Sequence, residues 1–153
     1  MPPYSSAFNG TAMEKIDGFP VPPSAALVEE ALRLFKPNSF YPSFEMRGDG
    51  DIVLVYLHSF IQECLKALDG TMGRRAAEEA LAPKAAEALR AGSEGLHSVC
   101  KKGEVTGELR KHLYGLRVLA VEELLKRVYR DSDTPDKWWL VFQKRKCAMG
   151  LSL

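Results

Sequence analysis

The sequence predicts an all-α fold, a single-domain helical bundle of about five or six helices around a central apolar helix. Three observations lead to this prediction. The chain has 153 residues, the size of one ordinary domain. Hydrophobic residues make up 46% of it and charged residues 27%, a mixture typical of globular proteins with a core. Hydrophobic side chains recur at helical spacing in several segments, and one segment, residues 52–68, is apolar on nearly every side.

Residues 1–23 are expected to form an extended N-terminal arm that precedes a helical domain over residues 24–153. Five of the nine prolines lie in this arm, at positions 2, 3, 20, 22 and 23. Proline lacks a backbone donor and favours extended conformations, so a regular helix is not expected there. Ser24 is a candidate N-cap for a first helix over residues 25–36, which we expect Pro37 to end.

The middle of the chain predicts one central helix and then two short ones. Twelve of the seventeen residues in 52–68 are apolar, and the length of the run favours a helix from a cap at Asp51 to Gly70 over a strand. Residues 71–91 are rich in alanine, glutamate and arginine, which favour helix, but we expect Pro83 to split the run into two. The glycine-spaced residues that follow, up to a candidate cap at Thr106, are typical of a loop.

Two further helices are predicted in the last third of the chain. Leucine, alanine and valine step by three or four residues over 107–130, with charged residues on the other side. Thr134, Pro135 and Asp136 are typical of a helix start, with an N-cap, a proline in the first turn and an acid at the positive end of the helix dipole. The final helix is expected to run from there to about Ala148.

Charge and composition exclude several classes of function. The 21 basic and 20 acidic residues give a net charge of +1, which argues against a dedicated polyanion binder. Residues 137–153 nevertheless carry basic residues and no acid, so the C-terminus could meet an acidic surface. Three widely spaced cysteines fit reduced thiols in a cytosolic protein. No leader peptide and no stretch long enough to span a bilayer is visible.

No constellation of residues points to catalysis. The three histidines lie in different predicted elements without carboxylates or cysteines at ligand spacing, so no metal site is expected. The glycine-rich patterns that bind phosphates are absent, so no nucleotide or other cofactor is expected. The segment around Ser93 does not match the nucleophile elbow of hydrolases. The sequence therefore predicts no catalytic residues and no enzyme.

The candidate partner-interface residues lie in the C-terminal segment. They combine aromatic and basic side chains and are Lys137, Trp138, Trp139, Phe142, Lys144, Arg145 and Lys146. Tryptophan and arginine often anchor interfaces, although in a small bundle both tryptophan rings could equally be partly buried within the chain's own core. Trp138 and Phe142 are four residues apart, so we expect them to face the core and Trp139 to face a partner. The N-terminal arm is a secondary candidate contact.

Three blocks of the sequence resemble the small third subunit of the actin-related protein 2/3 complex. The C-terminal block is Pro135-x-Lys137-Trp138-Trp139-x-x-Phe142-x-Lys144-Arg145. The other two are Val28-x-Glu30-Ala31-x-x-x-Phe35-Lys36-x-Asn38-x-Phe40 and Ile61-x-Glu63-Cys64-Leu65-Lys66-x-Leu68. They occur in the order and near-identical spacing of that family. The middle of the chain departs from it, because the family has a proline-rich stretch where this sequence is alanine-rich.

The resemblance implies a wholly helical, non-catalytic structural subunit of that complex, supporting actin filament nucleation and the formation of branched actin networks in the cytoplasm and cytoskeleton. The implied partners are the other subunits of the complex, chiefly actin-related protein 3, and the actin filament through the assembled complex, with no nucleic acid and no membrane. The alternative from the residues alone is a helical nucleic-acid-binding or general protein-interaction module that uses the basic C-terminal end.

Overall fold

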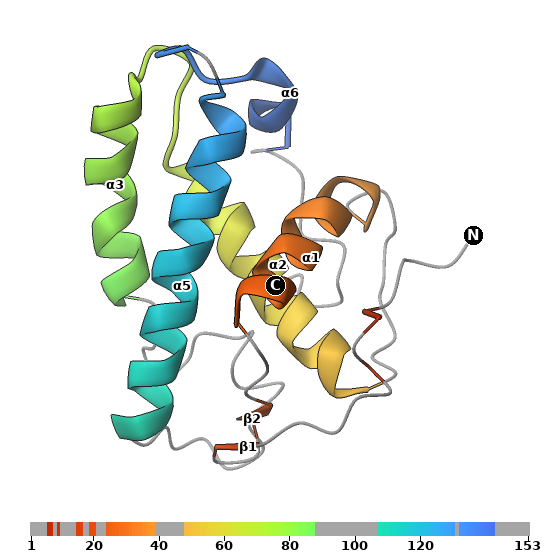
Figure 1. Ribbon diagram of the computed structural model, residues 1–153. Helices are drawn as coiled ribbons and strands as arrows, with labels where there is room; N and C mark the ends of the chain where they lie inside the picture. The colour runs from red at the N-terminus through yellow and green to blue at the C-terminus, as the bar shows by residue number, and fades with distance from the viewer. Residues whose placement is uncertain are drawn as a thin grey trace.

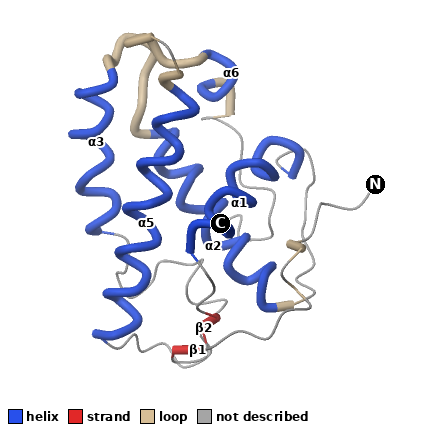
Figure 2. The backbone as a smooth tube through the Cα atoms, in the orientation of Figure 1, coloured by secondary structure: helices blue, strands red, loops and turns tan. Residues whose placement is uncertain are grey.

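The computed structural model describes residues 6–7, 9, 15–16, 19–20, 24–38, 48–87, 107–130 and 132–142. In these ranges the elements, in chain order, are two strands and five helices (Figures 1 and 2): β1 (Lys15–Ile16), β2 (Phe19–Pro20), α1 (Ser24–Asn38), α2 (Asp49–Lys66), α3 (Arg74–Glu87), α5 (Gly107–Val128) and α6 (Lys137–Leu140). The strands form one short antiparallel pair, with Ile16 opposite Phe19. The all-α prediction is confirmed.

Helix α2 is the central helix of the bundle, as its composition predicts. It contacts α1, α3 and α5, and the strand β2 also lies against it (Figure 1). Seven of its apolar side chains are 0–1% exposed: Val53, Leu54, Val55, Leu57, Ile61, Cys64 and Leu65. A helix that is covered on so many sides needs apolar residues around most of its circumference, which is the pattern of residues 52–68.

Three predicted helix boundaries in this region are wrong. Helix α1 continues through Pro37 to Asn38. Pro37 has no amide hydrogen to donate to the carbonyl of Arg33, four residues earlier. Arg33 is exposed, so water can bind this carbonyl instead. Helix α2 starts at Asp49, so Asp51 lies in the first turn and is not the N-cap. The helix also ends before Gly70, where its last turn tightens: the amides of Ala67 and Leu68 donate to the carbonyls three residues before them (3.1 and 3.2 Å).

Helix α3 is one helix, and the prediction that Pro83 splits it is wrong. Pro83 lies inside Arg74–Glu87 on the exposed side of the helix. The backbone carbonyl that loses its donor is that of Glu79, which is also exposed and can bind water instead. The buried side consists of Ala77, Leu81 and Ala85, four residues apart, and it is undisturbed by the proline.

Replacing Pro83 by alanine is expected to raise the free energy of unfolding by about 1 kcal/mol. Alanine restores the missing amide donor and has the highest helix propensity. Urea denaturation followed by circular dichroism measures the change. Ala82→Gly, at an exposed neighbouring position, is the control and is expected to lower stability by about 1 kcal/mol. A loss of stability in Pro83→Ala would show that the packing of α3 requires the proline.

Helices α3 and α5 lie side by side (Figure 1), and polar contacts hold α3 near both of its ends. At one end, the backbone amide of Arg74 donates to Asp133 (2.8 Å) and the Tyr129 hydroxyl donates to the carbonyl of Met72 (2.9 Å). At the other end, Arg117 is 2% exposed. Its Nε donates to the carbonyl of Ala85 (2.6 Å) and its Nη1 to the hydroxyl of Tyr56 (3.0 Å).

The helix predicted over residues 107–130 is confirmed by α5. Its buried side chains follow the predicted steps of three and four residues: Leu113, Leu116, Ala120, Leu124 and Val128. Among the described residues, no helix has the length and hydrophobicity that a bilayer span requires. The predicted loop after α3 and the candidate cap at Thr106 lie outside the described residues.

Candidate protein-interaction site

The C-terminal segment starts with a short helix that is attached to the end of α5. The backbone amide of Asp136 donates to the carbonyl of Val128 (2.8 Å), and the Asp136 side chain accepts from the amide of Trp138 (2.8 Å). Asp136 is therefore the N-cap, a role predicted for Thr134. Helix α6 is only four residues long and a turn follows at Val141 and Phe142, so the prediction of a regular helix to about Ala148 is wrong within the described residues.

The structure reverses the predicted roles of the two tryptophans. Trp139 is 5% exposed and stacks on Phe35, with ring centroids 6.2 Å apart and planes 13° apart. Phe142 is also buried, and its centroid lies 6.0 Å from that of Phe35. The prediction that Trp138 shares the inner side with Phe142 is wrong. The amide of Phe142 donates to the carbonyl of Trp139 (3.1 Å), and this tight turn brings residues three apart, not four, onto one side.

Helices α1 and α2 hold the inner aromatic rings in place. Lys36 of α1 lies over Trp139, with Nζ 4.3 Å from the ring centroid, which is cation–π geometry. Burial lowers the pKa of Lys36, and the nearby Asp136 carboxylate opposes that change. Gln62 of α2 donates from Nε2 to the carbonyl of Phe142 (2.9 Å). The turn is thus fixed to two helices of the bundle.

The outward side of this turn exposes a tryptophan, a valine and a lysine. Trp138 is 65% exposed and Val141 58%, and Lys137 is also exposed with its Nζ 5.7 Å from the Trp138 ring centroid. We call Lys137, Trp138 and Val141 the α6 surface. Of the described residues, only three large hydrophobic side chains are exposed, and two belong to this surface. Exposed apolar groups rimmed by charge are typical of a contact with another protein.

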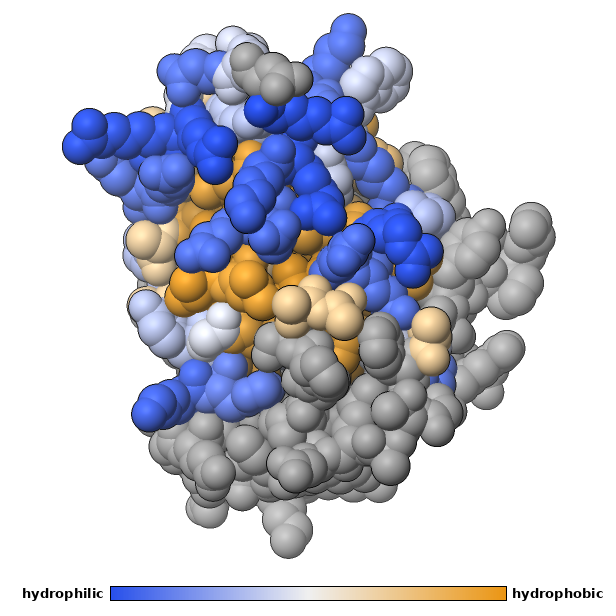
Figure 3. All heavy atoms as spheres, viewed as in Figure 1, coloured by the Kyte–Doolittle hydropathy of each residue, from blue (hydrophilic) through white to orange (hydrophobic). Residues whose placement is uncertain are grey.

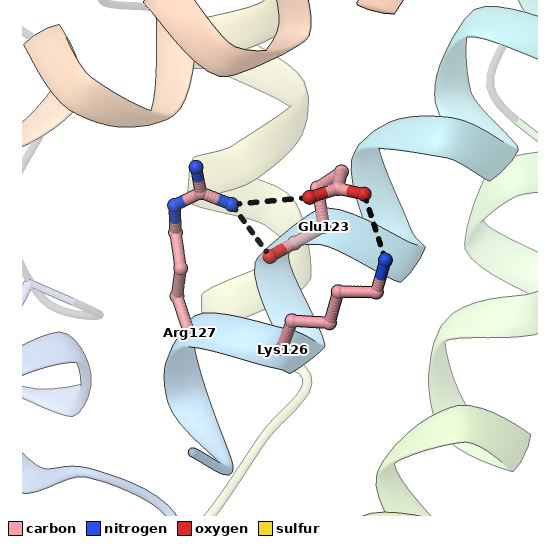
Figure 4. A network of polar contacts seen from close by, with 3 residues as sticks. All are labelled: Glu123, Lys126 and Arg127. Carbon is pink, nitrogen blue, oxygen red and sulfur yellow. Dashed lines mark hydrogen bonds and ion pairs between the residues drawn. The ribbon is translucent and has the colours of Figure 1, made fainter.

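The bases at the end of α5 differ from Lys137 in being paired within their own helix. Lys126 Nζ lies 3.0 Å and Arg127 Nη1 3.4 Å from the Glu123 carboxylate, and Arg127 also donates to the Glu123 carbonyl (Figure 4). The hydrogen bond from Lys126 is the main reason that the pKa of Glu123 is lowered. No ion pair joins Lys137 to a carboxylate of the described residues. Lys137 is therefore better suited than Lys126 or Arg127 to pair with an acidic partner.

A second apolar area lies over the middle of the bundle. Figure 3 shows hydrophobic residues gathered at the centre of this face, bordered above by hydrophilic ones. On α5 the partly buried apolar side chains are Val118, Leu119 and Val121, and Tyr114 of the same helix is 48% exposed. Because these aliphatic side chains also pack against the core, this area presents less free apolar surface per residue than the α6 surface.

The structure describes four of the seven predicted interface residues, and it places two of them on the surface and two in the core. Lys137 and Trp138 lie on the α6 surface, whereas Trp139 and Phe142 belong to the core. The remaining three, Lys144, Arg145 and Lys146, lie outside the described residues. Val141 was missed by the sequence prediction, since a valine between a leucine and a phenylalanine is typical of a core position. No group of three metal-binding side chains occurs among the described residues.

Comparison with known proteins identifies the family. The whole chain, residues 1–153, matches the family described as P21-Arc, the ARP2/3 complex ARPC3 (21 kDa) subunit. The chain belongs to this family. Members named actin-related protein 2/3 complex subunit 3 are similar to it along most of their length. The Dictyostelium discoideum protein is 36% identical over 130 residues, which cover 80% of this chain and 74% of the relative.

Members of the P21-Arc family from other lineages are similar to a comparable degree. The Arabidopsis thaliana protein is 31% identical over 126 residues, 78% of this chain and 72% of the relative. The Saccharomyces cerevisiae protein is 29% identical over 154 aligned residues, 94% of this chain and 83% of the relative. The resemblance drawn from three sequence blocks is confirmed, and it extends over the alanine-rich middle that departs from the family pattern.

Proposed function

We propose that this chain is a non-catalytic structural subunit of an actin-related protein 2/3 complex, where it supports actin filament nucleation and branched actin networks in the cytoplasm. The observation that carries this proposal is the match of the P21-Arc family to residues 1–153. The relatives carry the name of subunit 3 of that complex. The other subunits are therefore the partners we expect.

The burial of reactive side chains agrees with a structural role. His58 is 1% exposed and Cys64 0%. Burial lowers the pKa of His58 and raises the pKa of the Cys64 thiol, so each is held in its neutral form within the core. A substrate cannot reach either group without unfolding the bundle.

We place the main partner contact at the α6 surface and the basic end that follows it, with the N-terminal arm as a secondary contact. Trp138 supplies a large, rigid apolar side chain of the type that dominates binding energy at interfaces. Lys137, with Lys144, Arg145 and Lys146 beyond it in the sequence, gives the contact a positive charge. The family resemblance implies actin-related protein 3 as the neighbour, and the acidic surface of an actin-like protein suits this charge, so it is the subunit that we propose as the partner.

Replacing Trp138 by alanine is expected to weaken assembly about 10- to 100-fold, because an exposed tryptophan that becomes buried at an interface typically acts as a hot spot. The measurement is competition between tagged variant and wild-type chains for incorporation into the complex in cytosol, with the recovered actin-related proteins quantified. Thermal unfolding of the isolated chain is expected to stay unchanged, since Trp138 is 65% exposed.

Tyr114→Ala is the matched control, because it removes a half-exposed aromatic residue from α5 instead of α6. It is expected to assemble like the wild type. The reverse result, in which Tyr114→Ala weakens assembly and Trp138→Ala does not, would move the contact to α5. If the wild-type chain recovers no actin-related proteins from cytosol at all, the proposed membership of the complex is wrong.

A further inference from the structure

A short N-terminal segment is held by helices α1 and α2 through hydrogen bonds to buried carboxylates. We call its described residues, Ser6, Ala7 and Asn9, the clasp. Asp51 of α2 accepts the backbone amide of Ser6 (2.6 Å) and the side-chain amide of Asn9 (2.8 Å). The backbone amide of Asp51 in turn donates to Asn9 Oδ1 (2.8 Å). Asn9 and Asp51 thus exchange two hydrogen bonds.

The second carboxylate of the clasp comes from α1. Glu30 accepts the Ser6 hydroxyl on one oxygen (2.5 Å) and the backbone amide of Ala7 on the other (2.9 Å). Glu30 is 4% exposed, Asp51 0% and Ser6 5%. Two acidic groups from different helices therefore converge on Ser6. Buried carboxylates are tolerated only where donors satisfy them, and here the clasp supplies donors to both.

The start of α2 leaves little space around Ser6. A Cβ atom built on Gly50 would lie 2.5 Å from Ser6 Oγ and 2.8 Å from Ser6 Cβ, and one built on Gly48 would lie 2.9 Å from Asn9. The start of α2 therefore approaches the clasp so closely that only glycine fits at these two positions. No added group can be attached to Ser6 Oγ while the clasp stays bound.

We propose that Ser6 is a phosphorylation site that works as a latch, so that phosphorylated Ser6 and a bound clasp exclude each other. A protein kinase would transfer the terminal phosphoryl group of a nucleoside triphosphate to Ser6 Oγ. The new oxygen–phosphorus bond forms as the bond to the nucleoside diphosphate breaks, and the hydroxyl proton leaves to the kinase base. The product carries a charge of about −1.5 to −2 at neutral pH.

The phosphate group releases the clasp for three reasons. Its charge is repelled by the carboxylates of Glu30 and Asp51, and it replaces the hydroxyl hydrogen that Glu30 accepts. It also adds volume where the backbone of α2 leaves none. The bundle itself stays folded, because its core side chains come from the helices. All these contacts lie within one chain, so the latch does not depend on which partner the subunit binds.

Hydrogen exchange on the full chain carrying phosphoserine at position 6 tests the latch. The amide of Ala7 is expected to exchange at least about tenfold faster than in the unmodified chain, while amides of α5 keep their rates. Phosphoserine at Ser132, in an exposed turn, is the matched control and is expected to leave the exchange of Ala7 unchanged. Unchanged protection at Ala7, or loss of protection throughout the bundle, would overturn the proposal.

A reciprocal exchange of Asn9 and Asp51 tests whether their hydrogen bonds close the clasp. Asn9→Asp brings two carboxylates together, and Asp51→Asn leaves one acceptor oxygen for two donors. In the double variant, the side-chain amide introduced at position 51 can donate to the carboxylate introduced at position 9, so the pair is again made of one donor and one acceptor. Each single variant is expected to speed exchange at Ala7 at least about tenfold, and the double variant to restore most of the protection. A double variant that exchanges as fast as the singles would contradict the latch.

Discussion

Trp139→Ala is expected to lower the free energy of unfolding by about 3–5 kcal/mol, the range for removing a buried aromatic side chain. Trp139 is 5% exposed and stacks on Phe35, and the ammonium group of Lys36 lies over its ring. Alanine leaves a cavity between α6 and α1 and deprives Lys36 of its aromatic partner. Urea denaturation followed by circular dichroism measures the loss.

Trp138→Ala provides the control for this prediction, since it removes the same side chain from the neighbouring position. With 65% of Trp138 exposed, we expect a change within about 0.5 kcal/mol. The two variants thus separate stability from assembly: one unfolds more easily, the other assembles less well. Equal destabilisation by both variants would show that the turn does not divide the tryptophans between core and surface.

Acidification from pH 7 to pH 4 is expected to destabilise the fold by about 3 kcal/mol through His58 alone. Burial lowers the pKa of His58 from 6.5 to about 4, and its Nε2 lies 2.7 Å from the carbonyl of Ala31. Between these two values the unfolded chain binds a proton that the folded chain does not. The stability is therefore fully present above pH 6.5 and is lost as the pH falls towards 4. The lowered pKa of His112 acts in the same direction.

Denaturant titrations at a series of pH values measure this slope, and nuclear magnetic resonance identifies its source. The ring signals of His58 are expected to stay those of the neutral form down to about pH 4. His58→Gln can keep a hydrogen bond to the Ala31 carbonyl and is expected to show a smaller slope between pH 7 and 5. If His58 titrates near pH 6.5 in the folded chain, the prediction is wrong. Below pH 4.5, the lowered pKa of Glu123 adds a further loss that is small, since this residue is near the surface.

The parts of the fold that the sequence predicts well are those that depend on periodicity. The apolar stripe of α5 and the apolar circumference of α2 each lie within one helix. The spacing of apolar residues along that helix is therefore enough to predict which of its faces are buried. The effect of Pro83 could not be predicted in the same way. A proline ends a helix only where its missing hydrogen bond cannot be replaced, and that depends on which side of α3 faces water.

The sequence predicted which residues form the candidate site, but not which of its two tryptophans faces the core. The two tryptophans adjoin each other, so their roles depend on where the chain turns after Leu140 and on whether Phe35 of α1 lies close enough to stack. Both facts come from packing between segments that are far apart in the sequence. The clasp is a stronger example, because Ser6 pairs with Glu30 and Asp51, which are 24 and 45 residues away. No local pattern indicates such pairs.

The buried guanidinium of Arg117 has a consequence for how α3 is positioned along α5. The buried side of α3 is formed by Ala77, Leu81 and Ala85, so a slide of one turn would already place the leucine where an alanine packs. Arg117 reaches the Ala85 carbonyl, one of the last oxygens of α3 that lack a donor within the helix, and it reaches the hydroxyl of Tyr56 on α2. A slide of one turn, about 5.4 Å, would separate the guanidinium from the oxygen and leave a charge uncompensated in the core. Arg117 therefore fixes the lengthwise register of α3 at one end, as the contacts of Asp133 and Tyr129 do at the other.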